Sequence, residues 1–339
     1  MGDSGGCLGP SGKAATGQSG LRLLSLETFL AVLTARFGDK VRQNEKLAHH
    51  TTLRLGGPAE IWLTVERADQ LAEAVSLARQ HSVPFFILGG GANLLISDAG
   101  LPGLVIGNRA RRVQFPPVEP AIIGQPVTVV AESGAILPNL ARRCVKRGLS
   151  GLEWAVGVPG TVGGAVVNNA GAYGSDIALS LSRAELLSPE GKRLWQPGEW
   201  FEYDYRVSRL KHQDRAHQWV VLTAEFVMRA ALPSEVATRT DDFNARRKAA
   251  QPPGATIGSM FKNPPGDYAG RLIEAVGLKG YRQGQAQISP VHANFFQNLG
   301  QAQAAEVINL IQTAQAAVTE KFDITLELEI EVVGDFGQR

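Results

Sequence analysis

Residues 85–95 read FFILGGGANLL, an apolar run that meets three consecutive glycines and an asparagine before it becomes apolar again. The run before the glycines has the continuous apolar character of a buried strand. Three glycines in a row let successive backbone N–H groups turn toward one point, which forms a concave anion site that a Cβ atom would block. The alternative is a tight connection between two strands, and the loop by itself favours this alternative.

The residues after the glycines argue against a Rossmann dinucleotide site. That signature requires a helix directly after its glycines, because the pyrophosphate of the dinucleotide lies on the helix N-terminus. Here residues 94–106 read LLISDAGLPGLVI, with Gly and Pro interrupting the apolar residues. This composition predicts a second extended segment instead of a helix.

A second glycine-rich stretch, GVPGTVGGAVVNNAGAYG at residues 157–174, changes the interpretation of the first. It contains six glycines and no charged side chain, with Thr161, Asn168 and Asn169 as hydrogen-bonding residues. An exposed flexible loop usually carries charge, whereas this one suits a backbone pressed against a flat or phosphorylated group. Two such loops imply a large cofactor.

Helical and extended patterns are mixed along the rest of the chain. Residues 49–65 predict a strand, a turn at Gly56–Pro58 and a second strand, and the helix after them gives a β-α-β beginning. Near residue 251 the stretch QPPGATIG punctuates the chain and predicts a domain boundary just before it. Further helices are expected over 26–37 (with Ser25 as N-cap), 68–82, 137–147, 241–250 and 305–318, and further strands over 126–130, 219–227 and 323–334.

Composition limits the classes of function. A chain of 339 residues, 44% apolar and 19% charged, predicts a globular enzyme of two or three packed units. Its net charge of +2 and scattered basic residues give no footprint for nucleic acid. Cys7 and Cys144 form neither a CxxC pair nor a disulfide framework, and HExxH and clustered metal ligands are absent, so we expect a reducing compartment and no metal. No apolar run reaches the ~18 residues of a membrane span, which favours the cytoplasm.

Five blocks of sequence together resemble one known family. They are HTTLRLGGPAE, ILGGGANLLISD, GLSGLEWAVGVPGTVGGAVVNNAGAYG, GSMFKNPPG and AGRLIEAVGLKG, and they resemble UDP-N-acetylenolpyruvoylglucosamine reductase, the MurB family of bacterial cell-wall synthesis. The likeness runs from about residue 47 to 334. The first blocks are also similar to the wider superfamily of flavin oxidases that resemble vanillyl-alcohol oxidase, whereas GSMFKNPPG and the blocks after it are more specific. The short span between Arg206 and Ser259 resembles the subclass that lacks an extra substrate-covering loop.

The resemblance implies an α+β chain with an FAD-binding fold of the vanillyl-alcohol oxidase/PCMH type, made of two α+β subdomains, plus a C-terminal α+β substrate domain. We expect a disordered tail at 1–20, FAD-binding subdomains at 21–110 and 111–245, and the C-terminal domain at 246–339. The implied reaction is the FAD-dependent reduction, by NADPH, of the enolpyruvyl group of UDP-N-acetylglucosamine enolpyruvate to UDP-N-acetylmuramate. An FAD-dependent oxidase and a non-catalytic sugar-nucleotide-binding module are the alternatives. A cytoplasmic monomer with non-covalent FAD, and with no nucleic-acid or membrane partner, is expected.

The two glycine stretches are expected to surround the FAD pyrophosphate and neighbouring parts of the cofactor. The family pattern has Ser where this chain has Ala92, and the lost hydroxyl removes a hydrogen bond with a net effect of about 0.5–1.5 kcal/mol. FAD binding should therefore be somewhat looser. The implied cofactor-binding residues are Gly89, Gly90, Gly91, Asn93, Leu94, Gly157, Thr161 and Gly164.

Reduction of an enolpyruvyl ether assigns three chemical roles. Hydride reaches the terminal carbon, negative charge develops on the adjacent carboxylate as an enolate, and the inner carbon is then protonated. By resemblance, Arg206 in YDYRVSRLK grips the carboxylate, Ser259 in GSMFKNPP donates the proton, and Glu329 in LELEIEV assists both. From the residues alone, a surface arginine, a turn serine and a solvated carboxylate remain the alternatives. No GxSxG surrounds Ser259, which argues against a hydrolase.

Four residues are candidates for the sugar nucleotide. Lys262 and Asn263 follow Ser259 and offer a charge and an amide to the diphosphate, with Gln287 and Asn294 as further candidates. The family pattern has Pro where this chain has Leu328 and Arg where it has Glu331, which inverts a charge near the site. His292 is expected to be structural.

Overall fold

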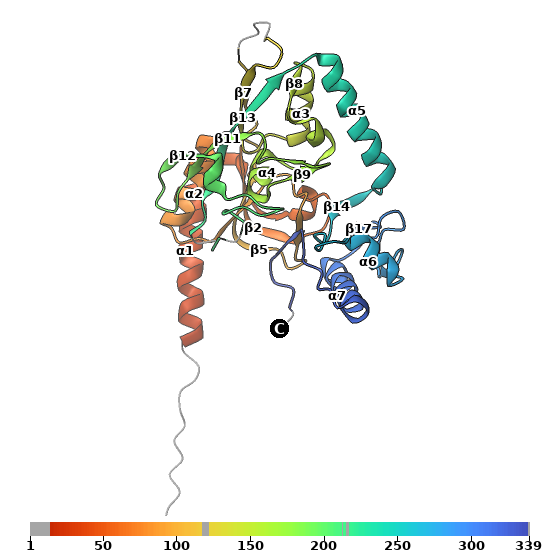
Figure 1. Cartoon of the computed structure of the whole chain (residues 1–339). Helices are drawn as coiled ribbons and strands as arrows, with labels where there is room; N and C mark the ends of the chain where they lie inside the picture. Colours follow the sequence, from red (N-terminus) through yellow and green to blue (C-terminus); the bar gives the residue numbers. More distant parts are fainter. Residues whose placement is uncertain (1–13, 117–121, 212, 215–216, 338–339) are drawn as a thin grey trace, which may run out of the picture.

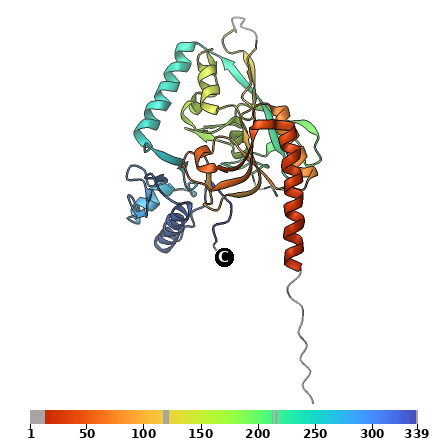
Figure 2. The same cartoon turned by 180° about the vertical axis from the view of Figure 1, so that it is seen from behind.

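The computed structural model describes residues 14–116, 122–211, 213–214 and 217–337, and the side chains from residue 26 onward within these ranges. Two sheets form the body of the molecule, and a third sheet with helices α6 and α7 forms a C-terminal lobe beside them (Figure 1). The reverse view shows α1 (Ala14–Phe37) extending away from the body at its N-terminal end (Figure 2). Among the described helices, none combines the length and hydropathy of a membrane span.

The first sheet contains the glycine loop at one end of a strand. Its order is β1-β2-β5-β3, in which β2, β5 and β3 run parallel. Helix α2 (Ala68–Gln80) connects β2 to β3, so the predicted β-α-β beginning is confirmed. The glycines leave β3 and enter β4 (Leu94–Ile96), which confirms the predicted extended segment. The strands are β1 (Val41–Lys46), β2 (Pro58–Val65), β3 (Phe85–Leu88) and β5 (Leu101–Asn108).

Two N-terminal predictions were wrong. Helix α1 begins at Ala14, so Ser25 lies within the helix and residues 14–20 are helical; residues 1–13 lie outside the described residues. The strand expected before Gly56 is instead a short 3-10 helix (Leu47–His50) and a turn. The Thr51 hydroxyl donates to the carbonyl of Leu55 at 2.8 Å and accepts from the Leu55 N–H at 3.1 Å, which closes the turn locally.

The second sheet has the order β12-β11-β13-β7-β6, and β8 also pairs with β13. Strands β7 and β13 and helix α3 (Leu137–Val145) confirm the predicted elements of the middle of the chain. Helix α3 packs its buried face, which includes Leu140 and Cys144, into the core beneath this sheet. The strands are β6 (Val113–Gln114), β7 (Pro126–Glu132), β8 (Leu149–Ser150), β11 (Leu181–Leu187), β12 (Arg193–Pro197) and β13 (Val220–Ala230).

The C-terminal lobe is a third, antiparallel sheet with two helices. Helix α5 (Pro233–Ala250) runs along the edge of the molecule and leads into the lobe (Figure 1). The order β14-β17-β16-β15 is covered by α6 (Ala269–Ala275) and α7 (Ala304–Phe322), and α7 confirms the predicted amphipathic helix. The strands are β14 (Ala255–Ser259), β15 (Arg282–Gln283), β16 (Ala286–Ile288) and β17 (Phe295–Asn298).

The prediction of one continuous strand over 323–334 was wrong, because the segment bonds first to residues 260–262 and then to β4. The Glu329 N–H donates to the carbonyl of Met260 at 3.0 Å, while the Lys262 N–H donates to Glu327 at 2.8 Å. The chain then turns and pairs in parallel with β4 as β18 (Glu331–Val333). This change of partner brings the C-terminal segment from the lobe to the glycine loop.

Candidate active site

The structure brings the two glycine stretches into backbone contact. A Cβ atom on Gly89 would lie 2.4 Å from Thr161 Oγ1, and one on Gly90 would lie 3.0 Å from the Cα atom of Gly160. Gly91 has φ +59°, and a Cβ atom there would lie 2.2 Å from the carbonyl oxygen of His50. A side chain at Gly91 would therefore clash with backbone, whereas one at Gly89 or Gly90 would require Thr161 or Gly160 to shift.

The backbone N–H groups of this loop fit an anionic group such as the FAD pyrophosphate. The N–H groups of residues 90–93 donate to no other described residue, while the Gly91 carbonyl accepts from the Thr52 N–H at 3.0 Å. Arg109 Nη1 donates to the Gly89 carbonyl at 2.7 Å, which helps to hold the loop in place. Burial lowers the pKa of the Arg109 guanidinium. A cradle of N–H groups that admits no Cβ atom is the geometry expected of a phosphate site.

The other candidate cofactor residues lie around this contact in different ways. Thr161 precedes the short helix α4 (Val162–Asn168) and accepts from the Gly164 N–H at 3.5 Å. Gly157 faces helix α5, because a Cβ atom on it would lie 2.6 Å from Arg247 Cδ. Leu94 begins β4 and pairs with Glu331. Contact with FAD remains a prediction for each of them.

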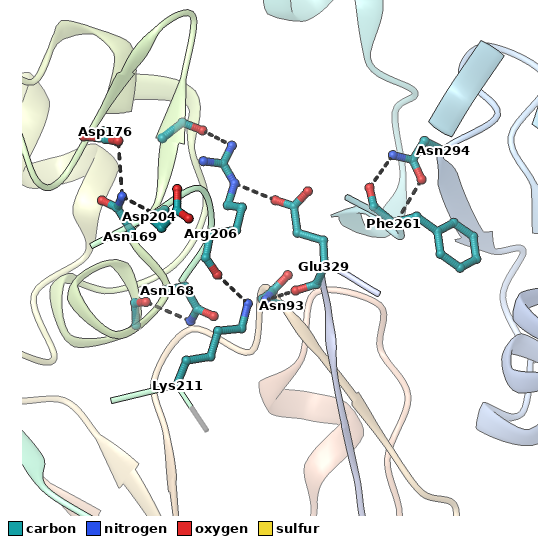
Figure 3. Close-up of polar contacts among 12 residues, drawn as sticks. Asn93, Asn168, Asn169, Asp176, Asp204, Arg206, Lys211, Phe261, Asn294 and Glu329 are labelled. Atoms are coloured by element: carbon teal, nitrogen blue, oxygen red, sulfur yellow. Dashed lines mark hydrogen bonds and ion pairs between the residues drawn. The ribbon is translucent and has the colours of Figure 1, made fainter. Parts of the chain in front are cut away.

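Arg206 occupies a tight turn in the left-handed region. Its φ is +58°, and the turn is closed by reciprocal backbone hydrogen bonds of 3.1 Å between Asp204 and Val207. Such a conformation costs a non-glycine residue free energy and is enriched at functional sites. The guanidinium donates from Nε to Glu329 Oε1 at 2.9 Å and from Nη2 to the Gly171 carbonyl at 2.6 Å (Figure 3). The second contact ties Arg206 to the second glycine stretch.

Glu329 stands between the lobe and the glycine loop. Its backbone N–H donates to Met260, the residue after Ser259, and its carbonyl accepts from Asn93 Nδ2 at 3.1 Å (Figure 3). Arg206 and Glu329 are each 19% exposed at the side chain and are therefore accessible to a small ligand. Arg206 and Glu329 are in direct contact, and Ser259 lies at the end of β14, next to the segment that carries Glu329.

The four candidate sugar-nucleotide residues all have partners within the protein. Lys262 forms an ion pair with Glu327, and the Asn263 side-chain oxygen accepts from the Ala269 N–H at 3.2 Å. Both groups of the Asn294 amide bond to the backbone of Phe261, at 2.8 and 2.9 Å, which holds the chain just after Ser259 (Figure 3). Gln287 Nε2 donates to Gly280 at 3.0 Å. Binding of the sugar nucleotide by these residues remains a prediction.

Sequence reasoning gave no role at this site to Lys211 or Gly171, and it named Asn169 only as a hydrogen-bonding residue of the second glycine stretch. Lys211 donates to the carbonyl of Arg206, Gly171 accepts from the Arg206 guanidinium, and Asn169 supports the turn through the Asp204 carbonyl at 3.1 Å. Lys211 appeared in the sequence only as a basic neighbour of Arg206. The contacts depend on loop conformations that periodicity does not describe.

Comparison with known proteins finds two family matches, one in the N-terminal part of the chain and one in the C-terminal part. Residues 59–195 match the family described as "FAD binding domain", and residues 250–333 match "UDP-N-acetylenolpyruvoylglucosamine reductase, C-terminal domain". The reductase of that name from Chloroflexus aggregans is 40% identical over 86% of this chain and 97% of its own. The one from Synechococcus sp. RCC307 is 43% identical over 88% and 95%. The crystal structure of the reductase from Thermus caldophilus has a TM-score of 0.70 at 35% identity, covering 86% and 98%.

The glycine loops and the matching FAD-binding domain define an FAD-dependent oxidoreductase with an FAD-binding domain and a C-terminal α+β domain. This class is the predicted one. The identity and coverage of the relatives place the chain within it: the chain belongs to the UDP-N-acetylenolpyruvoylglucosamine reductase family. The predicted family is therefore confirmed, whereas the domain boundaries and the roles of individual residues remain predictions.

Proposed function

We propose that this chain reduces the enolpyruvyl group of UDP-N-acetylglucosamine enolpyruvate to give UDP-N-acetylmuramate, a step of peptidoglycan precursor synthesis in the cytoplasm. NADPH is the reductant and FAD the resident cofactor. When bound, FAD supplies the hydride chemistry that amino-acid side chains lack. The protein's own residues bind and orient the substrate and move its proton.

The observation that carries the proposal is the contact between Arg206 and Glu329. An arginine fork suits a carboxylate because it donates two parallel hydrogen bonds, and it stabilises the charge that this carboxylate gains as an enolate. Glu329 engages only Nε of Arg206 in its 2.9 Å contact, and Gly171 engages Nη2. In the proposed complex the guanidinium faces the substrate carboxylate, and the glutamate orients it.

Ser259 is the proposed proton donor to the inner carbon of the enolate. A serine hydroxyl is a weak acid, so this role requires a strongly basic acceptor in a site closed to water. Ser259 is half-buried, and the chain directly after it is fixed, because its neighbour Met260 donates its N–H to the Asn294 carbonyl at 2.7 Å. Lys262 and Asn263, three and four residues further on, are the proposed contacts of the diphosphate.

Substitution of Ser259 by Ala tests the proposal. Reduction of the bound flavin by NADPH should keep its rate, whereas reoxidation of the reduced enzyme by the enolpyruvyl sugar should slow by several powers of ten, because only the second step needs the proton. Stopped-flow absorbance of the flavin measures both steps separately.

Three results would contradict the proposal in distinguishable ways. Equal loss of both steps in the Ser259→Ala variant would remove Ser259 from the proton-transfer role. Rapid reoxidation of the wild-type enzyme by air, without any response to the enolpyruvyl sugar, would favour an oxidase. Tight binding of the sugar nucleotide without turnover of NADPH would favour a non-catalytic module.

A further inference from the structure

Within the part of the chain that the structure describes, Lys211 is the one side chain that holds the backbone of Arg206. Lys211 Nζ donates to the Arg206 carbonyl at 2.9 Å (Figure 3). Among the described residues, no other donor reaches this carbonyl. The Arg206 side chain extends from the same residue to Glu329 and Gly171. The lysine therefore acts on the arginine at its backbone and leaves the guanidinium available.

The other contacts of this turn hold the residues on either side of Arg206 and leave its carbonyl to Lys211. Asp204 and Val207 close it with their reciprocal backbone bonds, and the Asp204 side chain accepts from the Tyr205 N–H at 2.6 Å. These bonds lie at the residues flanking Arg206. A φ of +58° costs a non-glycine residue free energy, so Arg206 depends on contacts that hold its peptide group. The Val207 N–H of that group bonds to Asp204, and the bond from Lys211 holds its carbonyl.

The surroundings of Lys211 place it within the charge system of the site. Burial lowers the pKa of the half-buried Lys211 ammonium, and the positive charge of Lys262 acts in the same direction. The carboxylates of Glu329, Glu327 and Glu331 act in the opposite direction. The Lys211 side chain therefore lies within the protein at this site and does not extend into solvent.

We propose that Lys211 is a positioning residue for the reaction, which holds Arg206 in its left-handed turn so that the guanidinium faces Glu329 and the substrate carboxylate. This inference rests on the proposed function. It assigns Lys211 no contact with the substrate. Loss of the lysine should therefore impair the step that uses the guanidinium more than it impairs binding of the sugar nucleotide.

Lys211→Met and Lys211→Arg test the proposal, because only the second retains a donor for the carbonyl. In Lys211→Met, reoxidation of the reduced enzyme by the enolpyruvyl sugar should slow about 10- to 100-fold, which is the effect expected of a misplaced catalytic group. Flavin reduction by NADPH should be unchanged, and the Kd of the sugar nucleotide should change by less than about threefold. Lys211→Arg should recover most of the lost rate.

The matched control is Lys40→Met, which removes another half-buried lysine, paired with Glu66 and outside the site. It should leave both steps unchanged. Equal slowing of both steps in Lys211→Met, a normal rate, a rise in Kd without loss of rate, or failure of Lys211→Arg to recover activity would each overturn the proposal. If Lys211→Met does not fold, Lys211→Ala, which also lacks a donor, is compared with Lys211→Arg and decides. Failure of the wild-type enzyme to use the enolpyruvyl sugar would instead refute the proposed function.

Discussion

Gly91 shows how the surroundings of a single residue determine which amino acid a loop position accepts. Sequence alone predicted that residues 89–91 need to be glycine, and the structure gives each a separate reason. Gly91 adopts φ +59° and lies against the backbone of His50, whereas Gly89 lies against Thr161 Oγ1. The partners come from segments before and after the loop, so the sequence identified the loop and the fold explains it.

Substitution of Gly91 by Ala should weaken FAD binding at least about tenfold. An alanine in the left-handed region costs roughly 1 kcal/mol, and here its Cβ atom would also lie 2.2 Å from the His50 carbonyl oxygen, so the loop must move. Gly38→Ala is a matched control, because Gly38 has φ +60° and no atom within 4 Å of the added Cβ. Flavin fluorescence during titration of the apoprotein measures both affinities. Equal FAD affinity in Gly91→Ala and wild type would contradict the role of the loop.

At the candidate site, the sequence pointed to individual residues but not to the contacts between them. Arg206 and Glu329 lie 123 residues apart in the chain, and their resemblance to a family motif brought both forward before the structure joined them. Asn93 was expected to contact FAD, yet its amide donates to the Glu329 carbonyl, 236 residues away. No periodicity predicts such a bond, because it depends on the mutual placement of the lobe and the loop.

At the scale of elements, periodic patterns succeeded where an element has one partner. Helices α2, α3 and α7 and strands β7 and β13 appeared where the patterns predicted them. The alternation in LELEIEV predicted a continuous strand, but residues 327–329 bond to 260–262 and residues 331–333 pair with β4. Alternation describes exposure along a segment and does not say how many partners the segment has.

The N-terminus of α7 offers a test of how an element is held. The Asp98 carboxylate accepts from the Ala304 and Ala305 N–H groups at 3.0 and 3.2 Å, so a residue just after β4 caps a helix of the lobe. Asp98→Ala should lower the free energy of unfolding by about 1–2 kcal/mol through the lost cap. Asp98→Asn, which keeps an acceptor without the charge, should lose less. Urea unfolding measures both, and an Ala variant as stable as wild type would contradict the capping role.

At the scale of the whole molecule, the buried apolar side chains connect the predicted domains. Leu187, Val220 and Leu222 of the second sheet pack in the core of the first. Leu53, Leu55 and Leu95 pack in the core of the lobe. Sequence predicted the α+β class and the order of the units, but it could not predict this shared packing, because each of these residues also suits a core within its own unit.

Cys144 reports on the integrity of the second core. It lies on the buried face of α3, and burial raises the pKa of its thiol to about 12. Since the thiolate is the reactive form, this raised pKa leaves very little of the reactive form at pH 8. In a Cys7→Ser variant, a thiol reagent such as DTNB should therefore react with Cys144 only as fast as the protein opens. Rapid labelling of the native protein at pH 8 would contradict this placement.

An exposed thiol provides the control for this measurement. Lys192 lies exposed in the turn between β11 and β12, so Lys192→Cys in the Cys7→Ser background should react at once under native conditions. Urea should then release a second thiol, that of Cys144, in the same transition that is seen by other probes of unfolding.

The parallel pairing of β4 with β18 has a consequence for biosynthesis. The Asn93 amide and the Glu329 carbonyl that it holds are 236 residues apart, so the ribosome completes the glycine loop long before it produces the loop's partner. At roughly 5–20 residues per second, this interval lasts roughly 10–50 s. During that time the nascent chain carries an unpaired strand next to its glycines, and the loop acquires its last support only after residue 331 has left the exit tunnel. The glycine loop therefore reaches its final geometry only after its C-terminal partner has been synthesised.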